Sequence, residues 1–283
     1  SGNLTGSAAE KTGALLADTT VEYGASTGSS TTPPTTTDTT TINGSYGAKT
    51  VLISNAANDA GHTVKLEGNL TLLGDGTNLI TVNEGATLST VTVKADMALN
   101  LGSAAAPSQG GNLGAKVELG NGSSLNAVAG DYTVGDVTGT GAVTANTGAN
   151  LNTGKINVNA VTADAANIKA TGDVTAGGIT LVKGGSVTSG ESITVNGSIE
   201  DADGTLQADG NITATDNSTL TDKDLKQAAG GKLTVVAGGT IKAAGITATN
   251  VAAKKLTASG DVAVDGGTLK LTGTGTGAAD VST

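Results

Sequence analysis

The sequence predicts an all-β protein built as a parallel β-solenoid with about 18–20 residues per coil. Three observations indicate this fold class: a composition dominated by small residues, a glycine phrase that recurs at nearly constant spacing, and a two-residue alternation of apolar and polar positions. The predicted organisation has three parts. They are an N-terminal strand-like arm over residues 1–25, a Thr, Ser and Pro-rich linker over residues 26–41, and the repetitive solenoid over residues 42–283.

The composition predicts a thin interior made of small aliphatic side chains. The chain has 283 residues but a mass of only 27.0 kDa, and it contains no Phe, Trp or Cys. Tyr23, Tyr46 and Tyr132 are its only aromatic residues, whereas a conventional globular core uses large aromatic anchors. Because 37% of the residues are hydrophobic, the chain has enough apolar surface to offset the entropy of ordering, which argues against disorder throughout.

The charge pattern disfavours nucleic acid as a partner, and the absence of Cys favours export. The formal net charge is −10, the pI is about 4.4, and no cluster of basic residues occurs, so binding to phosphates is not expected. No apolar run is long enough for a transmembrane helix. The absence of Cys is common among exported bacterial proteins, and we expect a mature chain, its signal segment removed, in an extracellular or cell-surface location.

The N-terminal arm and the linker precede the repeats. Residues 15–23, with the sequence LLADTTVEY, have strand-forming character but no repeat of their own. Residues 26–41, STGSSTTPPTTTDTTT, contain paired prolines and many Thr and Ser residues, which predicts an extended linker and excludes a packed helix or a central strand.

The repeats are marked by a phrase of Gly, a polar residue and then alternating apolar and polar positions. The phrase glycines recur at a nearly even spacing, and an upstream series recurs at a slightly shorter one. Such a period is typical of a solenoid, in which one coil buries its apolar face only by stacking on the next. The phrase glycines are Gly135, Gly154, Gly172, Gly190, Gly210 and Gly231, and the upstream ones are Gly68, Gly85 and Gly102.

Within each repeat the apolar residues alternate with polar ones, as at Ile193, Val195 and Ile199. A period of two predicts strands, with these side chains facing inward and with Asn and Thr ladders at the corners. Gly-Gly pairs provide the turns between strands. Residues 221–229, TDKDLKQAA, are the one segment of helical character and predict a short helical turn.

The stretch from Gly172 to Ile199, GDVTAGGITLVKGGSVTSGESITVNGSI, resembles the low-complexity β-helical segments of bacterial autotransporter passengers and of large repetitive adhesins and fibre proteins. The resemblance extends over most of residues 42–283. It implies a cell-surface solenoid and carries over no catalytic motif.

Two groups of residues could in principle contribute to a metal site, but for each of them a purely structural role is the preferred interpretation. Glu200, Asp201 and Asp203 are spaced like the opening of a calcium loop, but the rest of that loop is missing, and an acidic turn is favoured. His62 is the only histidine. Because a metal site needs several converging ligands, we expect a surface or turn histidine. No catalytic, cofactor-binding or metal residue is predicted.

Other recurrent features also have plain explanations. Lys254 and Lys255 are expected at a solvated corner. Glycosylation sequons are expected by chance in a chain this rich in Asn, Thr and Ser. The Thr-x-Thr pairs do not share the repeat period that an ice-binding face would need, and we expect them to be outward threonines on ordinary parallel strands. The sequons begin at Asn3, Asn43, Asn69, Asn121, Asn196, Asn211 and Asn217, and the Thr pairs begin at Thr90, Thr138, Thr213 and Thr247.

The sequence leaves three functions open. The preferred one is a non-enzymatic, self-associating structural subunit of a microbial fibre, sheath or surface layer, which forms a homo-oligomer or polymer. The second is an adhesin passenger that binds a cell-surface or glycan receptor, and the third and least favoured is a polysaccharide-acting enzyme, since there is no Arg or Trp to grip a sugar. No cofactor is expected. For assembly, the candidate residues are Leu15, Leu16, Val21 and Tyr23, which need a host sheet.

Overall fold

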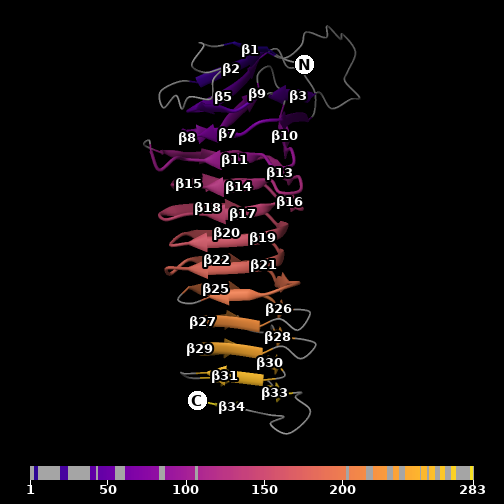
Figure 1. Ribbon diagram of the computed structural model, residues 1–283, viewed down its shortest axis with the longest axis vertical. Coiled ribbons are helices and arrows are strands. Elements are labelled where there is room, and N and C mark those ends of the chain that lie inside the picture. Colours follow the sequence, from indigo (N-terminus) through magenta and orange to yellow (C-terminus); the bar gives the residue numbers. More distant parts are fainter. Residues whose placement is uncertain are drawn as a thin grey trace. The chain divides into compact units, whose positions relative to one another are not determined.

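The computed structural model is all-β in the residues that it describes (Figure 1). The chain divides into two compact units, residues 1–152 and 153–283. The described backbone comprises residues 3–5, 20–24, 39–42, 44–54, 61–82, 87–105, 108–201, 204–214, 219–227, 232–235, 240–248, 250–253, 255–258, 262–264, 269–271 and 281–282. Side chains are described mainly between residues 39 and 214.

The first unit contains short strands of three to six residues. They are β1 (Asn3–Thr5), β2 (Thr20–Gly24), β3 (Thr39–Ile42), β4 (Tyr46–Ala48), β5 (Thr50–Ser54), β6 (His62–Leu66), β7 (Leu70–Leu72), β8 (Gly74–Asn78), β9 (Ile80–Val82), β10 (Leu88–Val93), β11 (Ala98–Leu101), β12 (Gly110–Asn112), β13 (Lys116–Leu119), β14 (Ser124–Ala127), β15 (Gly130–Thr133), β16 (Val137–Gly139), β17 (Ala142–Ala145) and β18 (Ala149–Thr153).

The second unit combines short strands with four longer ones of nine residues, β19, β21, β27 and β29. The strands of this unit are β19 (Ile156–Asp164), β20 (Asn167–Ala170), β21 (Val174–Val182), β22 (Ser186–Ser189), β23 (Ile193–Val195), β24 (Ile199–Asp201), β25 (Thr205–Ala208), β26 (Ile212–Ala214), β27 (Thr219–Gln227), β28 (Lys232–Val235), β29 (Thr240–Ala248), β30 (Asn250–Ala253), β31 (Lys255–Ala258), β32 (Val262–Val264), β33 (Leu269–Leu271) and β34 (Val281–Ser282).

The structure confirms an all-β chain with parallel strands, but the predicted stacked β-solenoid is wrong. Strands β1, β2, β5 and β9 form a separate four-stranded sheet in that order, and its β1–β2 pair is antiparallel. The other strands belong to a large curled parallel sheet. The glycine period therefore predicted the strands and their parallel direction correctly, but it did not predict which strands belong to the same sheet.

The distance along the sequence between paired strands explains part of this error. Val91 of β10 pairs with Val117 of β13, whereas Leu125 of β14 pairs with Val143 of β17, so the first pair is separated by a clearly longer stretch of chain. Backbone pairing is set by matching side-chain patterns on neighbouring strands, and not by the positions of glycines in the turns. The even glycine spacing upstream of Gly102 consequently does not correspond to any strand offset there.

In the first unit, parallel register brings similar apolar residues into rows across neighbouring strands. Val64, Val91, Val117 and Val137 form one such row on β6, β10, β13 and β16, and each of these side chains is fully buried. Burial of one such side chain is worth about 1.5–3 kcal/mol. Rows of small aliphatic residues thus replace the large aromatic anchors that the sequence lacks.

The second unit has the same construction. Val174, Ile193 and Ile212 lie in register on β21, β23 and β26 and are fully buried. The alternation predicted for Ile193, Val195 and Ile199 is confirmed, since all three side chains point inward and none is exposed.

The helical turn predicted for residues 221–229 is wrong. Residues 219–227 form strand β27, in which Thr221 pairs with Lys242 and Leu225 pairs with Ile246 of β29. Helix propensity is a weak local preference that backbone pairing readily overrides, and β27 has strand partners on both sides, β24 and β25 on one and β29 on the other.

Part of the predicted linker also pairs. Thr39 to Thr41 lie in β3, which runs parallel to β6 in register with Thr63 to Lys65, while residues 25–38 lie outside the described residues. Strand β3 therefore overlaps the last three residues of the predicted linker.

Some glycines are required because the neighbouring strand passes too close for a side chain. In β21, a Cβ atom at Gly177 would lie 2.4 Å from the backbone oxygen of Asn159, whereas a Cβ atom at Gly178 would meet only the backbone oxygen of Ser198, at 3.4 Å. Gly178 lies next to Gly177 in the same strand, so the two positions form a matched pair.

We expect Gly177→Ala to lower the free energy of unfolding by about 1–3 kcal/mol, because the backbone of β19 must move to admit the methyl group. Gly178→Ala should be neutral or should stabilise the fold by about 0.4–1 kcal/mol, because alanine restricts the unfolded chain. Urea unfolding followed by circular dichroism measures both. Equal effects of the two substitutions would contradict the strand packing described here.

Candidate functional site

The predicted assembly residues fall on the first strands of the chain. Leu15 and Leu16 lie outside the described residues. Val21 and Tyr23 lie on β2, which pairs in parallel with β5 of the same chain and antiparallel with β1. The host sheet that the sequence calls for is therefore present within the chain itself, while the role of these residues in assembly stays a prediction.

Strand β5 is fixed on the side away from β2. Its residues 51–53 pair in register with residues 80–82 of β9, and the backbone N–H of Val51 donates a hydrogen bond to the carbonyl of Leu79 at 2.9 Å. The side chains of Val51 and Ile53 are buried. One edge of β5 is thereby held in place, and the opposite edge receives β2 over five residue pairs. We call this opposite edge, residues 50–54, the β5 edge.

A buried polar pair joins β3 to β6. The Oγ1 atom of Thr40 and the Nε2 atom of His62 lie 2.8 Å apart, and both residues are almost completely buried. The expectation that His62 is a surface or turn residue is wrong. The strand alternation could have corrected it, because His62 shares its phase with Val64 and Leu66, which also point inward.

The acidic cluster is only partly described. Glu200 is exposed on β24, where it pairs with Thr180 and Thr221 on its two sides, and Asp201 is the last residue of that strand. Asp203 lies outside the described residues. Within the described part of the chain, no three residues among His, Cys, Asp and Glu are grouped closely enough to hold a metal ion.

A row of threonines runs across the outside of the second unit. Thr175, Thr194, Thr213 and Thr234 are in register on β21, β23, β26 and β28, and the first three are half-buried. The Thr-x-Thr pairs considered from the sequence do not identify this row of threonines. The sequence does contain a signal for this row, because each of these threonines directly follows the first apolar residue of the recurring glycine phrase.

An Asn and Thr ladder is present, but it lies within strands and not at the corners where the sequence predicts it. Asn126 Nδ2 donates to Asn100 Oδ1 at 2.9 Å, and Asn100 Nδ2 donates to Thr71 Oγ1 at 3.2 Å. These residues are in register on β7, β11 and β14. Polar side chains on the outer surface of the strands therefore form hydrogen bonds with one another from strand to strand, in the same direction as the backbone hydrogen bonds.

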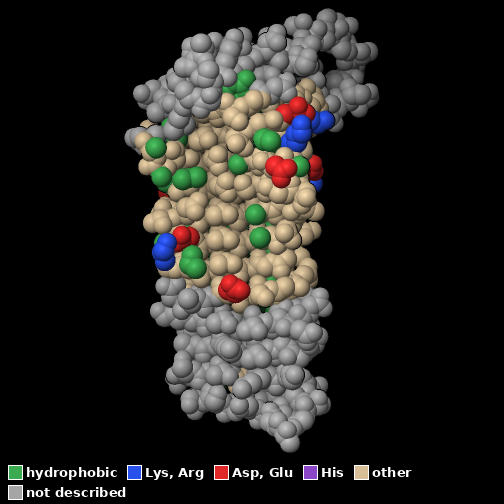
Figure 2. All heavy atoms as spheres, viewed as in Figure 1, with side chains coloured by type: hydrophobic (Ala, Val, Ile, Leu, Met, Phe, Trp, Pro, Cys, Tyr) green, Lys and Arg blue, Asp and Glu red, His purple; other side chains and the backbone are tan. Residues whose placement is uncertain are grey.

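The described surface in view is largely neutral. In Figure 2 most of it consists of uncharged polar side chains and backbone, with acidic and basic groups in small clusters of mixed sign. The ion pairs, Lys116 with Glu118 at 2.9 Å and Lys183 with Asp164 at 3.0 Å among them, are substantially exposed, and such pairs contribute about 0–1 kcal/mol.

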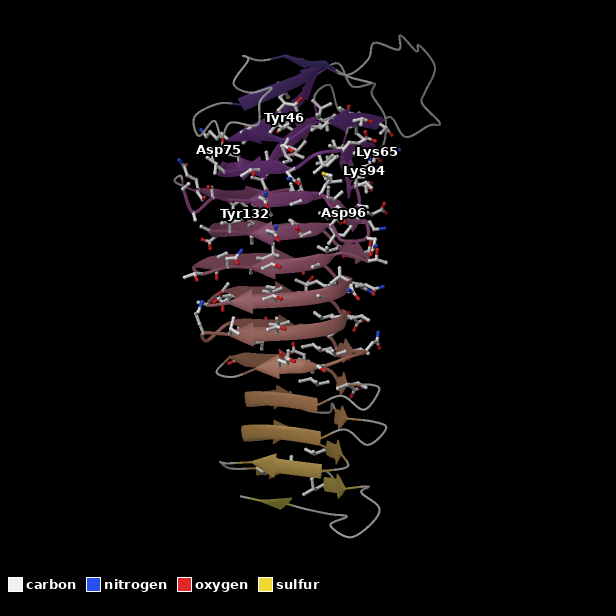
Figure 3. All side chains as sticks on the ribbon, in the orientation of Figure 1. Tyr46, Lys65, Asp75, Lys94, Asp96 and Tyr132 are labelled. Atoms are coloured by element: carbon white, nitrogen blue, oxygen red, sulfur yellow. The ribbon has the colours of Figure 1, made fainter. Side chains whose placement is uncertain are left out.

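Two titratable groups have shifted pKa values, for different reasons. A hydrogen bond donated by the Thr77 hydroxyl to the Asp75 carboxylate, assisted by the Thr77 backbone N–H and by Lys49, lowers the pKa of Asp75. Burial raises the pKa of Tyr132 above its usual 10.0. The Tyr132 hydroxyl donates to the carbonyl of Leu73 at 2.9 Å (Figure 3), so this tyrosine has a structural role in the interior.

The remaining sequence features lie at the surface where they are described. The sequon residues Asn69, Asn121, Asn196 and Asn211 are exposed. Asn3 lies on β1, whereas Asn43, Asn217 and Lys254 lie outside the described residues. Lys255 is the first residue of β31, so the basic pair adjoins a strand.

No protein family model matches the chain, and no curated protein or solved structure is similar to it at a significant level. Among the described residues there is no helix of the length and hydrophobicity needed to cross a membrane.

We expect Tyr132→Phe to lower the free energy of unfolding at pH 7 by about 0.5–1.5 kcal/mol, because it removes the buried hydrogen bond to Leu73. The raised pKa makes the contribution of the neutral phenol complete below pH 10 and lost as the pH rises through the folded-state pKa. The difference between wild type and variant should therefore shrink above pH 10. Urea unfolding between pH 7 and 11.5 tests this, with Tyr46→Phe as control, and a constant difference would contradict it.

Proposed function

We propose that this chain is a non-enzymatic structural subunit of a microbial cell-surface assembly, such as a fibre, a sheath or a surface layer, and that it self-associates through strand edges. The observation that carries the proposal is the four-stranded sheet of β1, β2, β5 and β9, with β1 at one edge and β9 at the other. The backbone N–H and C=O groups of an edge strand are a template for pairing with another chain.

The chemistry of the described surface favours self-association through the edges of the sheets over association through their faces. Neutral hydroxyl and carboxamide groups cover the strands, as in the threonine row from Thr175 to Thr213 and the ladder of Asn100 and Asn126. Large exposed apolar side chains, which mark many face-to-face interfaces, are limited to Leu269 in the described part of the chain. The resemblance of residues 172–199 to surface passengers and adhesins favours an extracellular location, as does the lack of Cys.

The second candidate function is an adhesin that binds a glycan or another cell-surface receptor. The threonine row favours it, because hydroxyls repeated at the strand spacing of about 4.8 Å offer donors and acceptors to a neutral, hydroxyl-rich ligand. In this case the strand faces and not the edges make the contact.

Negative-stain microscopy of the purified chain separates the two functions. We expect polymers that lengthen with protein concentration if the chain is a structural subunit, and isolated particles if it is an adhesin. A chain that lacks residues 1–25 should retain its β-type circular dichroism spectrum and lose the polymers. Polymers of unchanged length in this truncated chain would contradict the role of the N-terminal strands, and a monodisperse full-length chain would contradict the structural function.

A further inference from the structure

We propose that β2 is an exchangeable strand, and that in the assembled state the β2 strand of one copy occupies the β5 edge of a second copy. The inference rests on the proposed self-association and specifies its contact. The partner is a second copy of this chain, and the contact has the register that the structure shows within one chain.

The first argument is that the contact does not depend on which copy supplies the strand. Residues 20–24 pair with residues 50–54 over five positions, with Val21 opposite Val51 and Tyr23 opposite Ile53. Because β9 holds the other side of β5, the β5 edge is formed by residues that do not belong to the incoming strand. Exchange therefore conserves every backbone hydrogen bond of the pair, as in domain swapping.

The second argument concerns how β1 and β2 are attached. In the described part of the chain, β1 pairs with β2, and β2 pairs with β1 and with β5. The pair lies at the end of the sheet order β1, β2, β5, β9. A single strand interface therefore joins this pair to the rest of its sheet, and releasing that interface frees both strands together.

The third argument is the reach of the connection. Residues 25–38 separate Gly24, the end of β2, from Thr39, the start of β3, and consist mainly of Thr, Ser and two prolines. A chain of this length spans at most about 46–50 Å when fully extended, which is enough to reach a neighbouring copy. A tether of this length gives its own β5 edge an effective concentration in the millimolar range. Dilute protein thus stays closed, whereas the packed subunits of a surface assembly exchange.

The absence of cysteine makes a direct test possible. Glu22 of β2 lies opposite Leu52 of β5, and the strand spacing of about 4.8 Å lies within the Cα–Cα range of a disulfide. A chain with Glu22→Cys is mixed with a separate chain carrying Leu52→Cys, concentrated until polymers form, and oxidised. A disulfide between the two different chains forms if the strand is exchanged.

The matched control replaces Leu52→Cys with Thr81→Cys. Thr81 lies opposite Leu52 on β9, one strand further from β2, so it is out of disulfide range of residue 22. We expect a linked dimer in the Glu22 and Leu52 mixture, increasing with concentration, and none in the Glu22 and Thr81 mixture. A chain with both Glu22→Cys and Leu52→Cys should close on itself when dilute.

Three outcomes would overturn the proposal, and microscopy of the same samples tells the first two apart. Polymers without a linked dimer would show that the copies associate by another contact, which leaves the proposed function standing and removes the strand exchange. Neither polymers nor a linked dimer at any concentration would contradict both. Equal linkage in the mixtures with Leu52→Cys and Thr81→Cys would also overturn the exchange, because the register would then play no part.

Discussion

In-register parallel pairing of short strands is the constraint on which the rest of this structure depends. It places each side chain directly against its counterpart on the next strand, so every position must suit a row of similar neighbours. Inward rows such as Val64, Val91 and Val117 must be apolar, whereas outward rows can be polar when their members bond to one another, as Asn100 and Asn126 do. The composition of the chain follows from this requirement.

Close strand approach also explains the abundance of glycine and the scarcity of aromatic residues. A Cβ atom at Gly74 would lie 1.8 Å from the backbone oxygen of Gly110, a distance that no side chain tolerates. The interior between such strands has room for rows of Val, Leu and Ile. Tyr132 fits where one of its two neighbours in register, Gly111, contributes no side chain to the row, and where its hydroxyl finds a carbonyl acceptor.

The sequence predicted the local features of the fold and missed the features that depend on pairing. Strand alternation placed Ile193 and Val195 correctly because a period of two is a property of each strand by itself. The helical turn at residues 221–229 failed because Leu225 gains more from its place opposite Ile246 than from local propensity. Sheet membership was missed for the same reason, since the long offset from Val91 to its partner Val117 has no counterpart in the glycine spacing, although the shorter one from Leu125 to Val143 does.

The candidate site lies in the four-stranded sheet, where β2 pairs with β5. That β2 needs a host strand follows from its sequence, because a lone strand leaves its backbone groups unpaired. That the host is β5, with Val21 opposite Val51, depends on the fold. The outer surfaces of the strands bear neutral polar groups that remain hydrated and gain little from burial against another copy. Backbone edges gain more, because their N–H and C=O groups find partners at fixed spacing without desolvating a charge. Any association of this chain with itself is therefore favoured at the edges of its sheets, where the pairing that builds the fold continues into a second copy.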